Sequence, residues 1–279
     1  MIELHPMKFH FSNDYVFCTV LKRNKPLCKE LVEVLLDVKV RDIVFIESQE
    51  SINAAMDAKG IRLDVYAEDD NNTVFNLEMQ TTISRNLAKR SRYYQGMIDQ
   101  TLISRSEDYD ILKKSYIVFI CLNDPFIANL SKYTFSKVCM EDNRIALNDE
   151  TVTVFLNASG NRTGISDRLQ NFLDYLKTAE ATDEFTAQVE EKIKEVTASS
   201  KWRREYMTLE MKFKDIREES LAQGITQGMA QGIAQGMAQG TQNTLIKLVN
   251  DGLITVKDAS LQLGILEEEF EELLQKRAY

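Results

Sequence analysis

The sequence predicts an α/β protein with a helical C-terminal extension, and three observations support this fold class. Residues 61–80 alternate apolar and polar side chains in two stretches around a polar turn, as in a β-hairpin. A helical segment at 84–104 and an apolar run at 116–122 follow, an order typical of a βαβ crossover. From about residue 165 the composition is helical. A chain of 279 residues is long enough for one larger domain with helical additions.

The segment before the hairpin predicts two helices and a strand. Residues 12–14 offer candidates for a helix N-cap, and apolar residues recur after them at helical spacing. Pro26 is expected to separate two helical pieces, because proline lacks the backbone N–H that a helix interior needs. Residues 41–47 have the β-branched content of a strand, whereas 53–59 are ambiguous.

The hairpin has a register that follows from its alternation. The expected apolar face carries Leu63, Val65, Ala67, Phe75, Leu77 and Met79. Residues directly across an antiparallel pair point to the same side of the sheet. The register that sets Asp64 opposite Glu78 also pairs Asp69 with Thr73 and leaves 70–72 as a three-residue loop. Directly opposite Cβ atoms lie about 5 Å apart, so the two carboxylates are close enough to share a cation.

The polar face of this hairpin predicts a metal site. Asp64, Glu78 and Gln80 offer the hard oxygen ligands that Mg²⁺ or Mn²⁺ prefers. Such an ion activates water for attack on a phosphodiester, and Gln80 can orient that water or join the metal shell. The alternative is a solvated strand face whose carboxylates have no catalytic role.

Beyond the hairpin, the helical segment 84–104 carries a basic face. Arg85, Lys89 and Arg92 fall at positions i, i+4 and i+7, which share one side of a helix. This face is a candidate for contacts with a nucleic-acid backbone. The net charge of −9 does not exclude such binding, because a local basic strip is sufficient.

After the crossover, residues 151–156 predict another strand, 157–164 a loop, and the following residues amphipathic helices. The highly charged stretch 187–220 is interpreted as a solvated helix face.

Residues 223–240 form a repeat with a period of four. Glycine recurs at 224, 228, 232, 236 and 240, and isoleucine or methionine follows each of the first four glycines. Glycine costs about 1 kcal/mol per site relative to alanine in a helix. The segment is therefore interpreted as a helix in close contact with another helix in an oligomer, or as a pliable linker.

The last segment predicts a small helical module. Thr255 is expected to cap a helix over 256–263, and Gly264 to end it. A final helix is expected from about Leu266. The predicted domains are thus 1–164, the α/β core; 165–222, a helical extension; 223–240, the repeat, as a helix or linker; and 241–279, the C-terminal module.

Several classes of protein are not supported by the composition. The four cysteines form no CxxC pair, and only His5 and His10 are present, so a zinc site is not expected. The sequence shows no signal peptide and no apolar stretch near 18 residues. The chain is expected to avoid the membrane and to occupy a reducing cytoplasm.

The short motifs together resemble a known family. They comprise Ser12-Asn13-Asp14-x-x-Phe17, Arg62-Leu63-Asp64-Val65, Asn76-Leu77-Glu78-Met79-Gln80, the helix with Arg90, Tyr93 and Tyr94, and the Gln-Gly repeat with its helical tail. In order and spacing these motifs look like the PD-(D/E)XK nuclease-type transposase family, bacterial proteins related to the Rpn recombination-promoting nucleases. The similarity covers almost the entire chain.

The resemblance implies a restriction-endonuclease-like αβββαβ core and magnesium-dependent DNA cleavage linked to recombination or mobile elements. By matching position, Asp64 and Glu78 would be metal ligands. Gln80 falls where many members of the wider superfamily have lysine. Asp14 would be either a further ligand or a helix cap, and the cap is the preferred interpretation.

Glu47 and Glu50 are weaker candidates for the site, and Tyr94 is interpreted as a core residue. The predicted function is a metal-dependent DNA endonuclease with Asp64, Glu78 and Gln80 as catalytic residues, in the bacterial cytoplasm. It is expected to form a homo-oligomer through its C-terminal helical half. The alternative is a non-catalytic nucleic-acid-binding or assembly protein on a nuclease-like fold.

Overall fold

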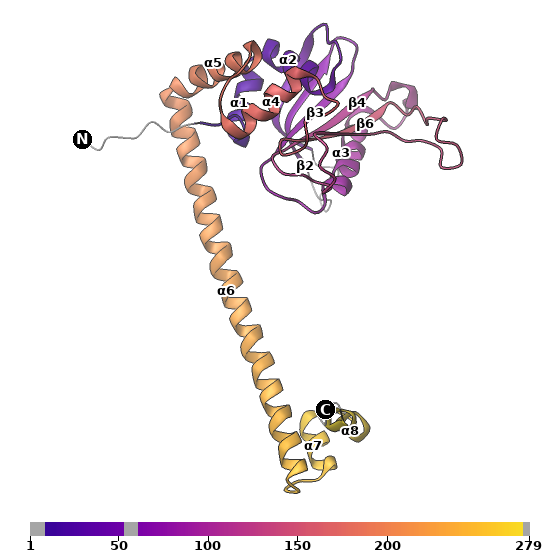
Figure 1. Ribbon diagram of the computed structural model, residues 1–279, viewed down its shortest axis with the longest axis vertical. Helices are drawn as coiled ribbons and strands as arrows, with labels where there is room; N and C mark the ends of the chain where they lie inside the picture. The colour runs from indigo at the N-terminus through magenta and orange to yellow at the C-terminus, as the bar shows by residue number, and fades with distance from the viewer. Residues whose placement is uncertain (1–8, 53–60, 276–279) are drawn as a thin grey trace, which may run out of the picture. The chain divides into compact units, whose positions relative to one another are not determined.

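A computed structural model describes residues 9–52 and 61–275 of the chain (Figure 1). His5, the ambiguous segment 53–59 and the side chain of Glu50 lie outside the described residues. Contacts between residues divide the chain into two compact units, Met1–Tyr206 and Met207–Tyr279.

The first unit is built on a six-stranded mixed sheet with the order β1-β2-β3-β4-β6-β5. The strands are β1 (Ile43–Ile52), β2 (Ile61–Asp69), β3 (Val74–Gln80), β4 (Ser115–Cys121), β5 (Lys132–Phe135) and β6 (Thr151–Asn157). β1, β2 and β3 form an antiparallel meander, β3, β4 and β6 run parallel, and β5 is antiparallel to β6. The predicted α/β class and the αβββαβ order of the core are confirmed.

The register of the β2–β3 hairpin is the one that the alternation predicts. Tyr66 pairs with Asn76, and the Asp69 N–H donates to the Thr73 carbonyl oxygen over 3.1 Å. The loop is therefore 70–72, and Asn72 adopts a left-handed backbone with φ of 61°. Asparagine tolerates this conformation better than most residues with a side chain.

The β3–α3–β4 unit is the predicted crossover between parallel strands, but its helix is shorter than expected. α3 spans Leu87–Leu102, and residues 81–86 connect it to β3 without regular helix. Arg85 lies in this connection, so the prediction that it shares a helix face with Lys89 and Arg92 is wrong. The chain needs these residues to leave the end of β3 before it can run back across the sheet.

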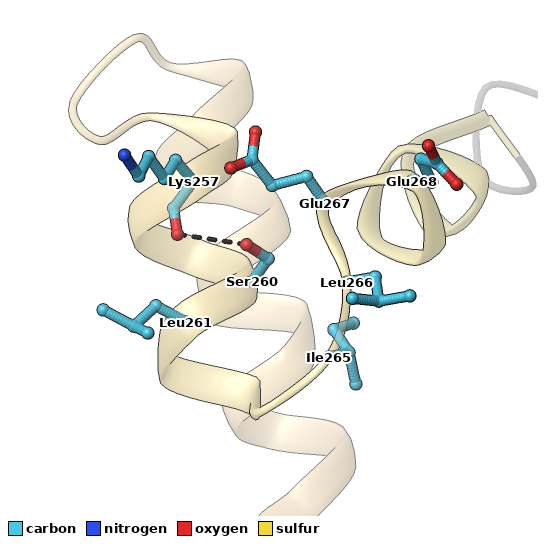
Figure 2. Close-up of a pocket in the computed structure, with 7 residues that line it drawn as sticks. All are labelled: Lys257, Ser260, Leu261, Ile265, Leu266, Glu267 and Glu268. Atoms are coloured by element: carbon cyan, nitrogen blue, oxygen red, sulfur yellow. Dashed lines mark hydrogen bonds between the residues drawn. The ribbon is translucent and has the colours of Figure 1, made fainter.

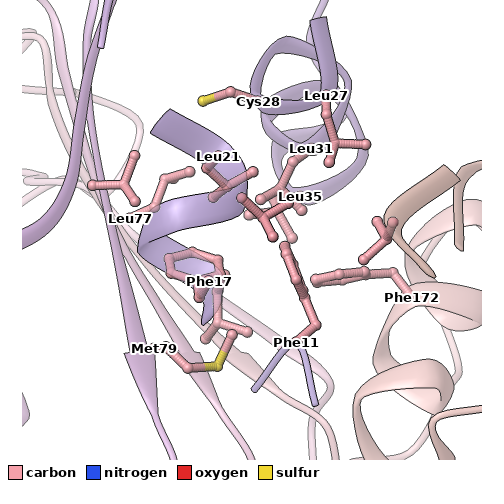
Figure 3. Close-up of a cluster of buried hydrophobic side chains, with 14 of the residues drawn as sticks. Phe11, Phe17, Leu21, Leu27, Cys28, Leu31, Leu35, Leu77, Met79 and Phe172 are labelled. Atoms are coloured by element: carbon pink, nitrogen blue, oxygen red, sulfur yellow. The ribbon is translucent and has the colours of Figure 1, made fainter. Parts of the chain in front are cut away.

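Two apolar layers hold helices against the sheet (Figure 1). α1 (Asp14–Arg23), α2 (Lys25–Leu36), α4 (Asp167–Thr178) and α5 (Glu184–Ala198) cover one face, and α3 covers the other. Pro26 stands in the first turn of α2 and separates it from α1, as predicted. Figure 3 shows Phe17 of α1 and Phe172 of α4 in the first layer, with Leu77 of β3.

The alternation of β2 breaks at Asp64. Val65 and Ala67 pack with α1 and α2 in the first layer, as Leu77 and Met79 do. Leu63 packs instead in the second layer with α3. The prediction that Leu63 and Val65 share a face is therefore wrong, because the strand changes its facing at the acidic residue between them.

Two short elements of the first unit escaped prediction. The edge strand β5 has only four residues, too few to show a periodic pattern. A single 3₁₀ turn, Tyr109–Ile111, lies between α3 and β4.

The second unit contains most of α6 (Ser200–Asn250), with α7 (Val256–Leu263) and α8 (Glu267–Gln275). Thr255 caps α7 by accepting the Asp258 N–H, and Gly264 ends it at φ of 69°, both as predicted. Phe270 is fully buried against Leu245 and Ile246 of α6. A shallow pocket lies between α7 and the start of α8 (Figure 2).

The Gln-Gly repeat is a continuous part of α6. A Cβ atom added to any of its five glycines would meet nothing within 4 Å. The side chains of Ile225, Met229, Ile233 and Met237 are each more than half exposed. None of the described helices has the length and apolar character needed to span a membrane.

Candidate active site

The site lies where β2 and β3 stop pairing through their backbones. Backbone pairing runs as far as Val65 and Leu77. Beyond that point the Asp64 N–H donates to Glu78 Oε1 over 3.1 Å, and the Met79 N–H donates to Asp64 Oδ2 over 2.9 Å. Each carboxylate thus accepts a backbone N–H from the opposite strand. These two contacts hold Asp64 and Glu78 together and satisfy two backbone donors. The prediction that the two acids form a directly opposite pair is not met, because the pairing of β2 with β3 ends at Val65 and Leu77.

Glu78 is buried, with only 2 % of its surface exposed. β3 is a central strand, and α3 covers the face that carries Glu78. A solvated strand face, the alternative interpretation of this residue, is therefore excluded by the geometry. A buried carboxylate is costly unless it has partners.

Arg90 of α3 supplies one of these partners. Its Nη2 atom lies 3.4 Å from Glu78 Oε2. Its guanidinium lies over the rings of Tyr94 and Phe119, at 5.4 and 4.9 Å from their centroids. The two rings stabilise the cation and hold it against the acid. Sequence reasoning assigned Arg90 no role in the site, although it interrupts the apolar stripe of α3 three residues after Leu87.

Helix α1 brings a third carboxylate to the site. Asn13 is the N-cap of α1, since its side chain accepts the Val16 N–H over 3.1 Å. The preferred interpretation of Asp14 as the cap is therefore wrong, and its carboxylate is available for the site. The Cys18 thiol donates to Asp14 Oδ1 over 3.3 Å or to the Asp64 carbonyl oxygen over 3.2 Å.

Among the described residues, the cluster with metal-binding geometry is formed by Asp14, Cys18 and Asp64. One ligand atom from each lies within 4.8 Å of the others. Burial, together with the charges of Asp14 and Asp64, raises the pKa of the Cys18 thiol, so the thiol is a protonated donor. The oxygen donors suit a hard divalent cation, and Glu78 adjoins them through Asp64.

The electrostatics of the site also fit a cation. Burial, and then the charge of Asp14, raises the pKa of Asp64. Burial, and then the charge of Asp64, raises the pKa of Glu78. Arg90 lowers both pKa values without cancelling the rise. The buried acids therefore tend to retain protons, and a divalent cation would replace these protons and stabilise the ionised carboxylates.

The two polar neighbours of Glu78 on β3 differ in their surroundings. Gln80 is half-buried at the end of the strand, and its Nε2 donates to the Met79 carbonyl oxygen over 2.8 Å. Asn76 is fully buried, and neither of its amide atoms has a partner of hydrogen-bond geometry among the described residues. Asn76 is nevertheless close enough to Glu78 to lower its pKa slightly.

The other predicted residues lie outside the acidic cluster. Lys89 and Arg92 are exposed on α3, and Arg85 is exposed just before it. Glu47 forms an ion pair with Lys22, which lowers the pKa of Glu47. Tyr94 is buried in the second layer, as predicted for a core residue.

The mixed sheet, the crossover helix and the paired acids define a nuclease-like α/β protein. A family model described as PD-(D/E)XK nuclease family transposase matches residues 11–223, and the chain belongs to this family. The resemblance seen in the sequence is thereby confirmed. The family indicates nuclease-type activity, for which DNA is the general substrate and divalent metals the general cofactors. No curated protein and no solved structure gives a significant match to the chain.

The raised carboxyl pKa values predict that the metal-free protein loses stability as the pH rises. The folded pair retains protons that the unfolded chain releases above an ordinary carboxyl pKa of about 4. Asp64→Asn removes one charge and keeps an oxygen that can accept the Met79 N–H. In EDTA near pH 8, its free energy of unfolding in urea should exceed that of the wild type by about 1 kcal/mol or more.

Glu180→Gln, which changes an exposed carboxylate of the same unit, should leave the free energy of unfolding unchanged. Added Mg²⁺ should stabilise the wild type and not Asp64→Asn. A wild type that is more stable than Asp64→Asn in EDTA near pH 8 would contradict the account of the acid pair.

Proposed function

We propose that the protein is a DNA endonuclease that hydrolyses phosphodiester bonds with Mg²⁺ or Mn²⁺. The observation that carries this proposal is the reciprocal contact between Asp64 and Glu78, with Asp14 beside Asp64. Two of the three acids also bond the diverging strands, but carboxylates gathered in one place with raised pKa values are typical of functional sites.

In this proposal Asp64, Glu78 and Asp14 would hold the cation. A bound Mg²⁺ or Mn²⁺ would polarise the scissile phosphate and lower the pKa of the attacking water. The reciprocal N–H contacts fix the carboxylates of Asp64 and Glu78 in advance. The side-chain oxygen of Gln80 would orient the attacking water, at the position where many members of the superfamily carry a lysine.

Positive charge that could bind the phosphate backbone of DNA lies on α3 and on the segment that connects β3 to α3. Lys89 and Arg92 are exposed on the helix whose Arg90 contacts Glu78, and Arg85 is exposed immediately before it. Cationic side chains of this kind supply sequence-independent affinity for DNA. The predicted nucleic-acid contacts at Arg85, Lys89 and Arg92 therefore remain part of the proposal, with Arg85 on a connecting segment.

The wider setting follows from the family and the cysteines. The transposase description supports a role in recombination or with mobile elements. Cys18, Cys28 and Cys121 are buried free thiols, as expected in a reducing bacterial cytoplasm.

We further propose that the protein is a homo-oligomer through α6. The repeat presents glycines with open space above them and exposed isoleucine and methionine side chains along the same helix. Small residues allow two helices to approach closely, and the apolar side chains beside them would be buried by the contact. A second copy carries the same repeat, so the two surfaces match in period.

Cleavage of plasmid DNA tests the nuclease directly. With Mg²⁺ or Mn²⁺ the purified protein should nick or linearise the plasmid, and EDTA should prevent it. Asp64→Asn and Glu78→Gln should each lower the rate by about 100-fold or more, because each removes charge from the cation site. Glu180→Gln is the matched control and should cleave at the wild-type rate. Equal cleavage by the wild type and both site variants would refute the assignment.

Substitution of the five repeat glycines by leucine tests the oligomer. The bulk of leucine should separate the helices, so light scattering should report the monomer mass for the variant and a multiple of it for the wild type. The control replaces the five glutamines that precede these glycines with alanine, and it should keep the wild-type mass. A monomeric wild type, or an oligomeric leucine variant, would rule out this contact.

A further inference from the structure

A cavity of about 670 Å³ opens beside the acidic site, between α3 and the start of β2. Its lining includes Arg62, Asn86, Lys89, Arg90, Tyr93 and Tyr94. Pockets of about 300 to 1,000 Å³ hold small organic molecules, so this cavity has room for one nucleotide.

The chemistry of the lining fits a nucleotide better than a simple anion or an apolar ligand. Arg62 and Lys89 are exposed cations that can bind a phosphodiester. Tyr93 is 39 % exposed at the cavity and offers an aromatic surface for base stacking. The amide of Asn86 can both donate to and accept from a base edge. A simple anion would not need the aromatic surface, and an apolar ligand would not need the cations.

Two residues of the cavity lining connect it to the acid pair. Arg90 lines the cavity and contacts Glu78 at 3.4 Å. Arg62 lines it as well and lies two residues before Asp64 on β2. A phosphodiester held by Arg62 and Lys89 would therefore lie next to the proposed cation site.

We propose that this cavity binds one unstacked nucleotide next to the scissile phosphate, with its base on Tyr93. The inference rests on the proposed nuclease function and specifies its substrate class as DNA with unpaired bases. A base in a perfect duplex is stacked between its neighbours and must be extruded before it can enter a pocket, whereas an unpaired base enters at lower cost. The protein thus prefers single strands, mismatches and junctions over continuous duplex.

Fluorescence anisotropy on the full chain tests the cavity without requiring cleavage. The probes are a labelled oligonucleotide of about 15 nucleotides and the duplex of the same sequence, both in EDTA. The wild type should bind the single strand more tightly than the duplex. Tyr93→Ala should weaken single-strand binding about tenfold and duplex binding by less than about twofold, whereas Tyr93→Phe should keep the stacking surface and the wild-type values.

Tyr109→Ala is the matched control, since Tyr109 is 79 % exposed in a separate 3₁₀ turn, and it should bind both probes as the wild type does. A wild type without preference for the single strand would overturn the proposal. So would an equal loss on both probes in Tyr93→Ala, or no loss at all.

Cleavage with Mg²⁺ of a duplex that contains a mismatched bubble separates this inference from the nuclease assignment. Preferred cutting at the bubble that Tyr93→Ala abolishes supports both. If cutting depends on Asp64 but Tyr93→Ala does not change the preference for the bubble, the proposed nucleotide-binding cavity is wrong and the nuclease assignment stands. Tyr93-dependent binding without any cutting supports the cavity and overturns the nuclease.

Discussion

The burial of Glu78 next to Asp64 is the constraint on which the rest of the first unit depends. Burial raises the pKa of both acids, and the charge of Asp14 adds to the rise at Asp64 as the charge of Asp64 adds to the rise at Glu78. Each carboxylate accepts a backbone N–H from the opposite strand, so the acids also replace hydrogen bonds that the diverging strands would lose. The pair is therefore part of the sheet as well as a candidate active centre.

The elements around the pair each contribute to this arrangement. The crossover places α3 over β3 and β4, and this brings Arg90 to Glu78 with Tyr94 and Phe119 beneath the guanidinium. α1 packs on the opposite face and contributes Asp14, whose carboxylate is free of capping because Asn13 is the cap. The site thus offers fixed carboxylate oxygens whose protons a divalent cation would replace.

The sequence predicts those features that depend on local pattern. The register of the hairpin follows from the alternation of its strands and from the residues of its turn. The ends of α7 follow from Thr255 and Gly264. Both features are set by backbone preferences that act over a few residues. The division of α1 from α2 follows from Pro26 in the same way. These predictions needed no knowledge of tertiary contacts.

The features that escaped prediction depend on contacts between distant elements. Strict alternation placed Leu63 with Val65, but the strand changes its facing at Asp64, where the neighbouring strand pairing ends. The sequence placed Arg90 in a motif that resembles the family, and only the packing of α3 shows that it faces Glu78. Asn13 and Asp14 are both good N-cap residues, so the sequence could not tell which one caps α1. The structure shows that the Asn13 side chain accepts the Val16 N–H.

Titration calorimetry with Mn²⁺ tests the central claim most directly. If the acid pair retains protons until a cation replaces them, binding should release protons, seen as a heat that depends on the ionisation enthalpy of the buffer. Asp64→Asn should show no such binding. Absence of Mn²⁺ binding to the wild type, or unchanged binding by Asp64→Asn, would contradict the account and favour a non-catalytic assembly protein on a nuclease fold.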